Sequence, residues 1–122
     1  MAERITVNDV IKEIDEIKPN VFPESVKTRW LSECESEIRL RTGGTSVRLK
    51  YPEDGEHELS VPHPYDKLYY HYLEAAIDFR TKDYAGYENS AAAYNEALTE
   101  YLKYYERSKS SSWKEANNDS QT

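Results

Sequence analysis

Apolar residues recur at helical spacing along four stretches of the chain, and the last of these stretches is rich in tyrosine. Between residues 84 and 105 the apolar positions are separated alternately by three and four residues: Tyr84, Tyr87, Ala91, Tyr94, Leu98, Tyr101 and Tyr105. This period keeps one stripe of a helix against a partner. A tyrosine buries its ring but leaves a hydroxyl that needs a polar neighbour. The stripe therefore fits an assembly surface, and it equally fits one face of an ordinary amphipathic helix in a small bundle.

The first helix is predicted over residues 5–17, where apolar side chains occupy one face. Thr6 can cap its first turn, and Asp9 stands three residues later, in the position that a capping box requires. Pro19 ends the helix, because the residue before a proline avoids the helical region. The local sequence thus predicts both ends of this helix.

Two further helices lie between the first helix and the tyrosine-rich one. The second begins near Pro23, a residue suited to the first helical position, and it ends at Gly43–Gly44. The third runs from about residue 64 to residue 81. The turn at Lys82–Asp83 is so short that the third and fourth helices are expected to be antiparallel neighbours.

Residues 45–62 interrupt the helical pattern. Apolar and polar residues alternate on both sides of a turn signal at residues 52–55. This alternation predicts a small β-hairpin or extended excursion between the second and third helices. Because the rest of the domain is helical, we expect the excursion to project from the bundle and to carry contacts with other molecules.

The end of the chain is polar and predicts no packed structure. Residues 109–122 contain one large apolar side chain, Trp113, which is either an accident or an anchor that becomes ordered on binding.

The fold class predicted from the sequence is therefore all-α. A four-helix bundle domain occupies residues 1–108, with the excursion at 45–62 and a flexible C-terminal tail at 109–122.

The bulk composition limits the possible partners. The 122 residues fit one domain, and their formal net charge of −7 argues against a groove that grips phosphates. The mean hydropathy of −0.92 indicates a lean core that a partner could help to stabilise. A single cysteine excludes an internal disulfide, and no apolar run approaches the ~20 residues of a membrane span. No signal-peptide core is recognisable, so we expect a soluble protein made in a reducing cytoplasm.

No residue pattern predicts an active site, a metal site or a cofactor. The three histidines match no zinc spacing. Glu33, Glu35 and Glu37 lie on the polar side of the second helix, where solvation is the expected role, although an acid–base enzyme using Glu33 and Glu37 is a possible alternative. Cys34 falls in the apolar stripe and fits a small buried hydrophobe better than a nucleophile. We therefore expect a protein that is not an enzyme.

The tyrosines favour an association surface. Tyr70 and Tyr104 fall outside the main apolar stripes, so they are expected to face outward and to form a candidate assembly surface. A stacking platform for single-stranded nucleic acid is the rival interpretation. That platform would need a basic track, and glutamates outnumber Lys103 and Arg107 along the fourth helix.

Two stretches resemble a known family. They are VNDVIKEIDEIKPNVFPESVKTRWLSECESEI, from Val7 to Ile38, and VPHPYDKLYYHYLEAAIDFRTKDYAGYENSAAAYNEAL, from Val61 to Leu98. The KPN ending of the first helix, the K-x-RWL-x-E of the second and the VPxPYDKLYxxYLxAxIDF entry to the third carry the likeness. Together they resemble the small head–tail connector proteins of long-tailed bacteriophages and prophages, also called head-completion or adaptor proteins. These motifs concern packing and capping and identify no catalytic residue.

The resemblance implies a virion structural protein at the head–tail interface. It implies a homo-oligomeric ring, commonly of twelve copies of the chain, beneath the portal protein. Such a ring extends the DNA channel, lets DNA pass without specific binding, and docks the next connector, stopper or tail protein. An acidic lining would repel phosphates and suit such a channel. The protein would be made in the bacterial host cytoplasm.

The resemblance also implies contact residues by position. Within residues 107–122, the candidate portal contacts are Arg107, Lys109, Trp113 and Lys114. In the excursion, the candidate contacts with a neighbouring subunit or the next ring are Val47, Leu49, Tyr51, Asp54 and Leu59. The alternative function is a small helical interaction module, such as an assembly factor or regulator, that binds a single partner protein.

Overall fold

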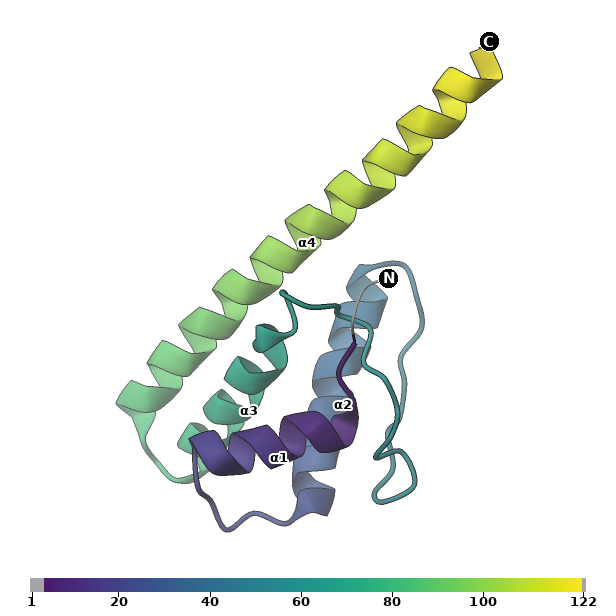
Figure 1. Ribbon diagram of the computed structural model, residues 1–122. Helices are drawn as coiled ribbons and strands as arrows, with labels where there is room; N and C mark the ends of the chain where they lie inside the picture. The colour runs from purple at the N-terminus through teal and green to yellow at the C-terminus, as the bar shows by residue number, and fades with distance from the viewer. Residues whose placement is uncertain (1–3, 122) are drawn as a thin grey trace.

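The chain folds into helices that share one core. A computed structural model describes residues 4–121, with side chains from residue 4 to residue 109. Over this range it contains four helices and no strand: α1 (Val7–Ile17), α2 (Glu24–Arg41), α3 (Lys67–Arg80) and α4 (Tyr84–Gln121). Helices α3 and α4 run antiparallel beside one another, α2 lies against α3, and α1 crosses in front of α2 (Figure 1). The all-helical class predicted from the sequence is confirmed.

The predicted signals at the helix ends act as expected. The Thr6 hydroxyl accepts a hydrogen bond from the Asp9 amide at 3.2 Å, and the Asp9 carboxylate accepts one from the Thr6 amide at 3.0 Å. This is the reciprocal capping box. After α2, Gly43 has a φ of 86°, a conformation that only glycine adopts without strain. The Gly44 amide then donates to the Arg39 carbonyl at 2.7 Å and satisfies a terminal carbonyl of the helix.

The core draws on all four helices and on the segment between α2 and α3. Trp30 and Leu31 of α2, Tyr69 and Leu73 of α3, and Ile14 of α1 are all fully or almost fully buried. Apolar residues of α4 join them along its first half. Leu49, Leu59 and Val61, which lie outside the helices, complete the same cluster.

The predicted β-hairpin at residues 45–62 is wrong. The only β-type pairing among the described residues is an isolated bridge between Thr6 and Glu58. One half of the segment is bound to α2, because the Ser32 and Ser36 hydroxyls hydrogen-bond to the backbone of Val47 at 2.7–3.0 Å. The Ser32 hydroxyl also accepts from the Leu49 amide at 2.9 Å. Serine side chains thus take the place of a partner strand.

The other half of the segment is bound to the N-terminal residues. The amides of Val7 and Asn8 donate to the carbonyls of His57 and Gly55 at 3.1 and 2.9 Å. The Leu59 amide donates to the Ile5 carbonyl at 2.9 Å. The expectation that this excursion projects from the bundle is therefore wrong. Of its alternating apolar residues, Leu49, Leu59 and Val61 pack into the helical core, where no second strand faces them.

A fully buried carboxylate joins this segment to the helices. Glu35 of α2 is 0% exposed and accepts hydrogen bonds from the Tyr69 hydroxyl at 2.6 Å and from the Arg39 guanidinium at 3.1 Å. It also accepts from the amide and hydroxyl of Ser60 at 2.9 and 3.1 Å. The Tyr69 hydroxyl in turn accepts from the Val61 amide at 3.1 Å. A buried charge is tolerated only when it is paired and hydrogen-bonded in this way.

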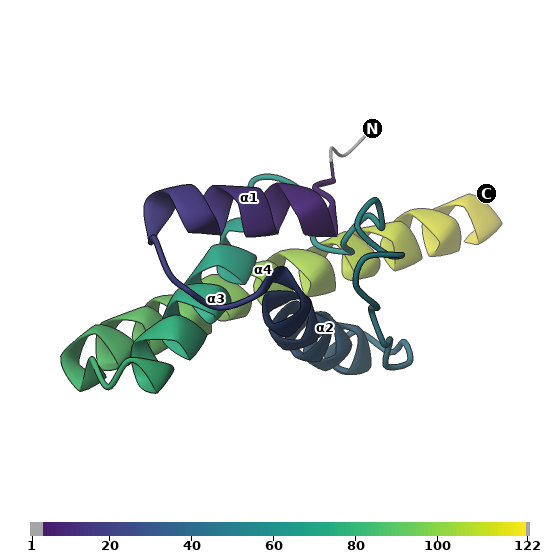
Figure 2. The ribbon, with the colours of Figure 1, turned by 90° about the horizontal axis from the view of Figure 1, so that it is seen from below.

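Helix α4 continues past the body of the molecule to Gln121, where the sequence predicted a flexible tail from residue 109. Figures 1 and 2 show its C-terminal half extending beyond the other three helices. Its 38 residues correspond to a rod about 57 Å long. Residues 106–121 contain neither glycine nor proline, so nothing in the sequence ends a helix that the core has already nucleated.

Removing the Tyr69 hydroxyl should destabilise the fold. Tyr69→Phe would leave the Val61 amide without its acceptor and Glu35 with one donor fewer in a buried site. We expect the free energy of unfolding to fall by about 1–3 kcal/mol. Urea unfolding followed by far-ultraviolet circular dichroism measures this change. The matched control is Tyr84→Phe, because Tyr84 is exposed and should change stability by less than about 0.5 kcal/mol. Equal effects of the two substitutions would contradict the proposed role of Glu35 and Tyr69.

Candidate interaction groove

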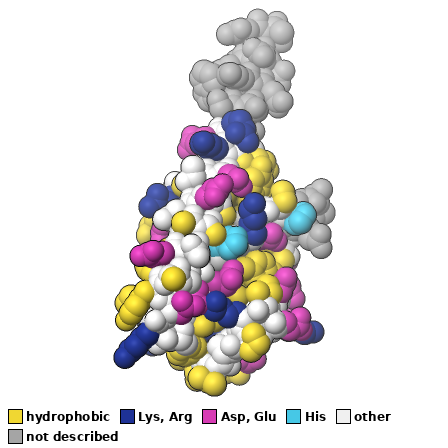
Figure 3. Space-filling view, turned by 90° about the vertical axis from the view of Figure 1, so that its left-hand side faces the viewer, with side chains coloured by type: hydrophobic (Ala, Val, Ile, Leu, Met, Phe, Trp, Pro, Cys, Tyr) yellow, Lys and Arg dark blue, Asp and Glu magenta, His cyan; other side chains and the backbone are white. Residues whose placement is uncertain are grey.

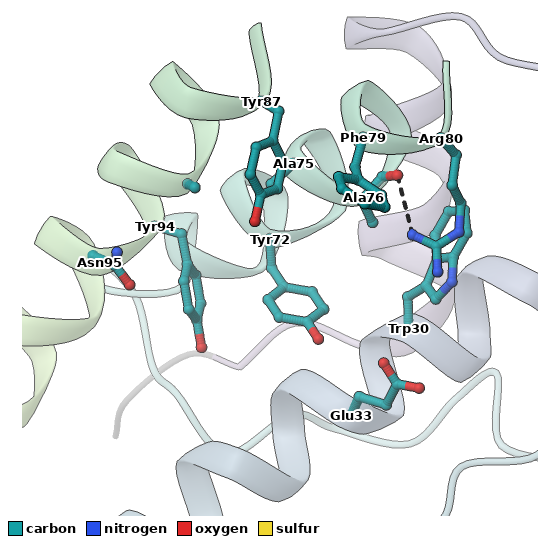
Figure 4. Close-up of a pocket in the computed structure, with 11 residues that line it drawn as sticks. Trp30, Glu33, Tyr72, Ala75, Ala76, Phe79, Arg80, Tyr87, Tyr94 and Asn95 are labelled. Atoms are coloured by element: carbon teal, nitrogen blue, oxygen red, sulfur yellow. Dashed lines mark hydrogen bonds between the residues drawn. The ribbon is translucent and has the colours of Figure 1, made fainter. Parts of the chain in front are cut away.

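An open groove lies between α2, α3 and α4, with a volume of about 400 Å³. Aromatic rings form most of its wall, so we call it the aromatic groove. Tyr72 and Phe79 come from α3, Tyr87 and Tyr94 from α4, and Trp30 from α2 (Figure 4). The groove exists because the tyrosine stripe of α4 and the corresponding face of α3 diverge from α2 toward the α3–α4 turn.

The tyrosine stripe divides into a buried part and an exposed part. Tyr94 and Tyr101 are 7% and 5% exposed and belong to the core. Tyr84 and Tyr87 are 57% and 37% exposed, and both pack their rings against Phe79 at centroid distances of 6.3 and 5.3 Å. The C-terminal portion of the stripe is therefore an internal seam, and its N-terminal portion is an exposed aromatic surface, whose use in assembly stays a prediction.

Charged groups line one side of the aromatic groove. The Arg80 guanidinium lies 4.5 Å from the centre of the buried Trp30 ring, a favourable cation–π geometry, and donates to the Ala76 carbonyl at 3.4 Å (Figure 4). Glu33 of α2 is exposed at the rim. Burial, with smaller contributions from Cys34 and Glu33, raises the pKa of Tyr72 to about 12. The groove can therefore hold an apolar or aromatic side chain between one cation and one carboxylate.

The candidate nucleophile and bases, Cys34, Glu33 and Glu37, have separate surroundings in the structure. Cys34 is fully buried, its Sγ lies 3.9 Å from the Tyr94 hydroxyl, and burial raises the pKa of its thiol well above the usual value. Glu37 forms an exposed ion pair with Arg41 at 3.4 Å. Glu33 is exposed and forms no hydrogen bond with the Cys34 thiol, which contacts Tyr94. No group in the described part of the groove combines a nucleophile with an adjacent base.

Three buried ionic groups were not recognised from the sequence. Glu35 was assigned to the solvated side of α2 but is buried, and its spacing of four from Leu31 and three from Ile38 could have revealed this. Lys27 is 2% exposed and lies 2.5 Å from the Asp15 carboxylate. The position of the Glu35 carboxylate on the apolar face of α2 is the feature of the sequence that indicates its burial.

The third of these groups, Asp78, is 1% exposed at the end of α3. Its carboxylate lies 2.6 Å from the Lys18 ammonium and accepts a hydrogen bond from the Ser90 hydroxyl at 2.9 Å. The hydrogen bond to Asp78 raises the pKa of Lys18. This cluster ties the end of α1 to both helices of the α3–α4 pair.

The structure divides the five candidate contact residues of the 45–62 segment. Leu49 is 6% exposed and Leu59 is 0% exposed, so both belong to the core and neither can reach a neighbour in this conformation. Tyr51 is 46% exposed. Val47 and Asp54 are half-buried, and the Asp54 carboxylate accepts from the Lys50 amide at 2.7 Å.

The candidate assembly residues Tyr70 and Tyr104 do not face outward freely. Tyr70 is half-buried, and its hydroxyl donates to Glu13 of α1 at 2.7 Å. Tyr104 is also half-buried and stacks on Tyr65 at a centroid distance of 4.7 Å. The prediction that they face outward missed these partners, because both partners come from segments remote in sequence.

The candidate portal contacts lie at the projecting end of α4. Arg107 and Lys109 are exposed on the helix just beyond the core. Trp113 and Lys114 fall where the helical backbone is described but the side chains are not, so their contact role stays a prediction. None of these four residues lies near the aromatic groove, whose α4 residues end at Asn95.

The described residues contain no group of three His, Cys, Asp or Glu side chains placed to hold a metal ion. The three histidines have separate neighbours. His57 lies 3.1 Å from the Arg39 guanidinium, His71 lies 3.2 Å from Glu74, and His63 lies 3.8 Å from Asp66. They do not converge on one site.

None of the helices in the described range combines the length and apolar content needed to cross a lipid bilayer. In Figure 3 acidic, basic and apolar side chains are interspersed, and no continuous track of lysine and arginine runs along the described part of that face. A basic track is what a nucleic-acid stacking platform would need.

Comparison with family models, with curated proteins and with solved structures gives no match for this chain. The site is therefore interpreted from its own geometry.

Cys34 should be unreactive in the native protein. It is fully buried and its thiol pKa is raised, so a thiol reagent should reach it only when the protein unfolds. We expect its labelling rate to follow global unfolding and to rise by at least about a thousandfold in denaturing urea. A Cys34→Ala/Asn89→Cys variant supplies an exposed thiol on α4 as the control and should react at once. Rapid labelling of Cys34 in native buffer would show that the α2–α4 seam opens locally.

The fold should lose stability in alkali. Burial raises the pKa values of Tyr69, Tyr72 and Tyr94, and the hydrogen bond to Asp78 raises that of Lys18. In the unfolded chain these groups lose their protons near pH 10. The stabilising contribution is therefore complete below about pH 10 and is lost as the pH rises toward the higher folded-state values. Urea unfolding at several pH values measures the decline, and Tyr94→Phe should reduce its slope. A free energy of unfolding that stays constant through this range would contradict the assignment.

Proposed function

We propose that this chain is a non-catalytic assembly subunit, and specifically a head–tail connector protein of the kind its sequence resembles. The observation that carries the proposal is the projection of α4 beyond the core. A polar helix without packing partners is marginal in water. A helix of this kind gains stability when another protein covers it, since a partner that binds only the folded form stabilises it.

The surface composition agrees with a place in a larger particle. Phe79, Tyr84 and Tyr87 form an exposed aromatic cluster at the end of the molecule opposite the projecting part of α4 (Figure 1). Exposed aromatic clusters on a small domain mark association surfaces. The chain therefore offers protein partners two separate contact regions, as a subunit between a portal and a tail component would need. Its net charge of −7 would let DNA pass without being held.

Attachment to particles tests the proposal. Purified full-length protein is mixed with DNA-filled capsids that carry a portal but lack the connector, and the particles are imaged in negative stain. We expect a ring of added density at one vertex. A stoichiometric complex with one soluble partner, and no vertex density, would instead support the single-partner interaction module.

Substitution of Trp113 tests whether this residue takes part in the proposed portal contact. Trp113→Ala should weaken attachment by about 2 kcal/mol, or roughly thirtyfold in Kd, if the tryptophan is a buried anchor. Its thermal midpoint should not change, because position 113 belongs to the part of α4 that extends past the other three helices. The neighbouring Ser112→Ala is the matched control and should bind as the native chain does. Undiminished attachment of Trp113→Ala would remove this residue from the portal contact.

A further inference from the structure

A hollow with a basic rim lies on the outer side of α2, where the segment 46–50 runs along the helix. Its volume is about 1050 Å³. Four cations surround it, and the 60%-exposed Leu40 lies among them; this surface, which we call the basic face, comprises Arg29, Leu40, Arg41, Arg48 and Lys50. Among the described residues Arg29, Arg48 and Lys50 form no ion pair, and Arg41 pairs with Glu37. Such a concentration of unpaired positive charge is unexpected in a chain with a net charge of −7.

A second hollow, of opposite character, lies on the solvent side of α1 and has a volume of about 440 Å³. We call it the acidic face; it comprises Asp9, Lys12, Glu13, Glu16 and the half-buried Tyr70. Its three carboxylates outnumber its single lysine. The half-buried Tyr70 ring adds apolar surface to this face, as Leu40 does to the basic face.

The two faces point in different directions. Figure 2 shows α1 along the upper edge of the view, and α2, seen nearly along its axis, in the lower middle. Each helix buries one side in the shared core, through Val10 and Ile14 of α1 and Trp30 and Leu31 of α2. The charged sides of both helices are therefore turned away from the shared core.

We infer that the basic face of one copy docks onto the acidic face of a second copy. The charges are complementary, and apolar side chains, among them Leu40 and Tyr70, line both hollows. Because the two faces are unlike, the contact is head-to-tail, and such contacts close into a ring when the rotation between copies allows it. This inference rests on the proposed function, since it assigns the contact between subunits of the proposed ring.

A second copy fits the basic face better than a phosphate-bearing ligand does. Glu33 and Glu37 also line this hollow and would repel phosphates. A protein surface that carries both positive and negative charges can pair with the cations and the glutamates of this hollow. The acidic face is such a surface, because Lys12 lies among its carboxylates. The mixed composition of each face is thus matched by that of the other.

Charge reversal tests the contact directly. Arg29→Glu/Arg48→Glu makes both faces acidic, and Glu13→Lys/Glu16→Lys makes both faces basic. We expect each double variant to weaken self-association by at least about tenfold in Kd, measured by sedimentation at low salt and protein concentrations up to the millimolar range. A mixture of the two variants should regain association, because each acidic subunit then meets a basic one. Glu88→Lys/Glu96→Lys, two exposed positions on α4, reverses the same number of charges and should leave association unchanged.

The outcomes separate this inference from the proposed function. A native chain that stays monomeric at millimolar concentration, or variants that associate as the native chain does, would overturn the inference. The inference would also be overturned if the mixed variants did not regain association while circular dichroism showed that each remains folded. If the native chain self-associates in this charge-dependent way but adds no density to connector-free particles, the contact stands and the connector function fails. If particles gain the density while both variants still form it, the function stands and this contact fails.

Discussion

The buried carboxylate of Glu35 is the interaction on which the arrangement of the other elements depends. A carboxylate that leaves water must find donors for its oxygens, and no single neighbouring helix supplies enough of them. Here the donors come from α2 itself, from α3 and from the segment before α3. Arg4, which donates to the Ser60 carbonyl, adds the N-terminal residues to the same network. Satisfying one charge therefore fixes the relative positions of segments that are far apart in the chain.

This constraint has consequences for the surface. Because Ser60 and Val61 are held against Glu35 and Tyr69, the segment between α2 and α3 folds back onto the body and fills part of the core. It is not available as a projecting arm. The contact regions that we propose lie elsewhere: at the exposed end of the α3–α4 pair, on the charged outer sides of α1 and α2, and on the projecting part of α4.

The tyrosines show how one stripe can serve two purposes. Near the middle of α4 their rings fill the seam with α2 and α3, and their hydroxyls reach polar partners, as Tyr105 does at the Thr42 carbonyl. Near the start of α4 the rings lie beyond the reach of α2 and remain on the surface. An amphipathic residue tolerates both settings, which a stripe of leucine would not. The proposed connector function uses the exposed part, and the stability of the domain uses the buried part.

The sequence by itself determined the helices and their ends. The capping box at Thr6, the glycines after α2 and the short turn before α4 act within a few residues of the positions they control, so local spacing was enough to find them. It also found the apolar residues of the 45–62 segment, but not what they pack against. Only the tertiary structure decided that Glu35 is buried, that serines of α2 replace a partner strand, and that Tyr70 bonds to Glu13. Each of these depends on a partner more than ten residues away in the chain, and periodicity along one segment carries no information about which distant group will meet it. The groove between α2, α3 and α4 is hidden from the sequence for the same reason, since its walls come from three helices whose relative positions are set by the core.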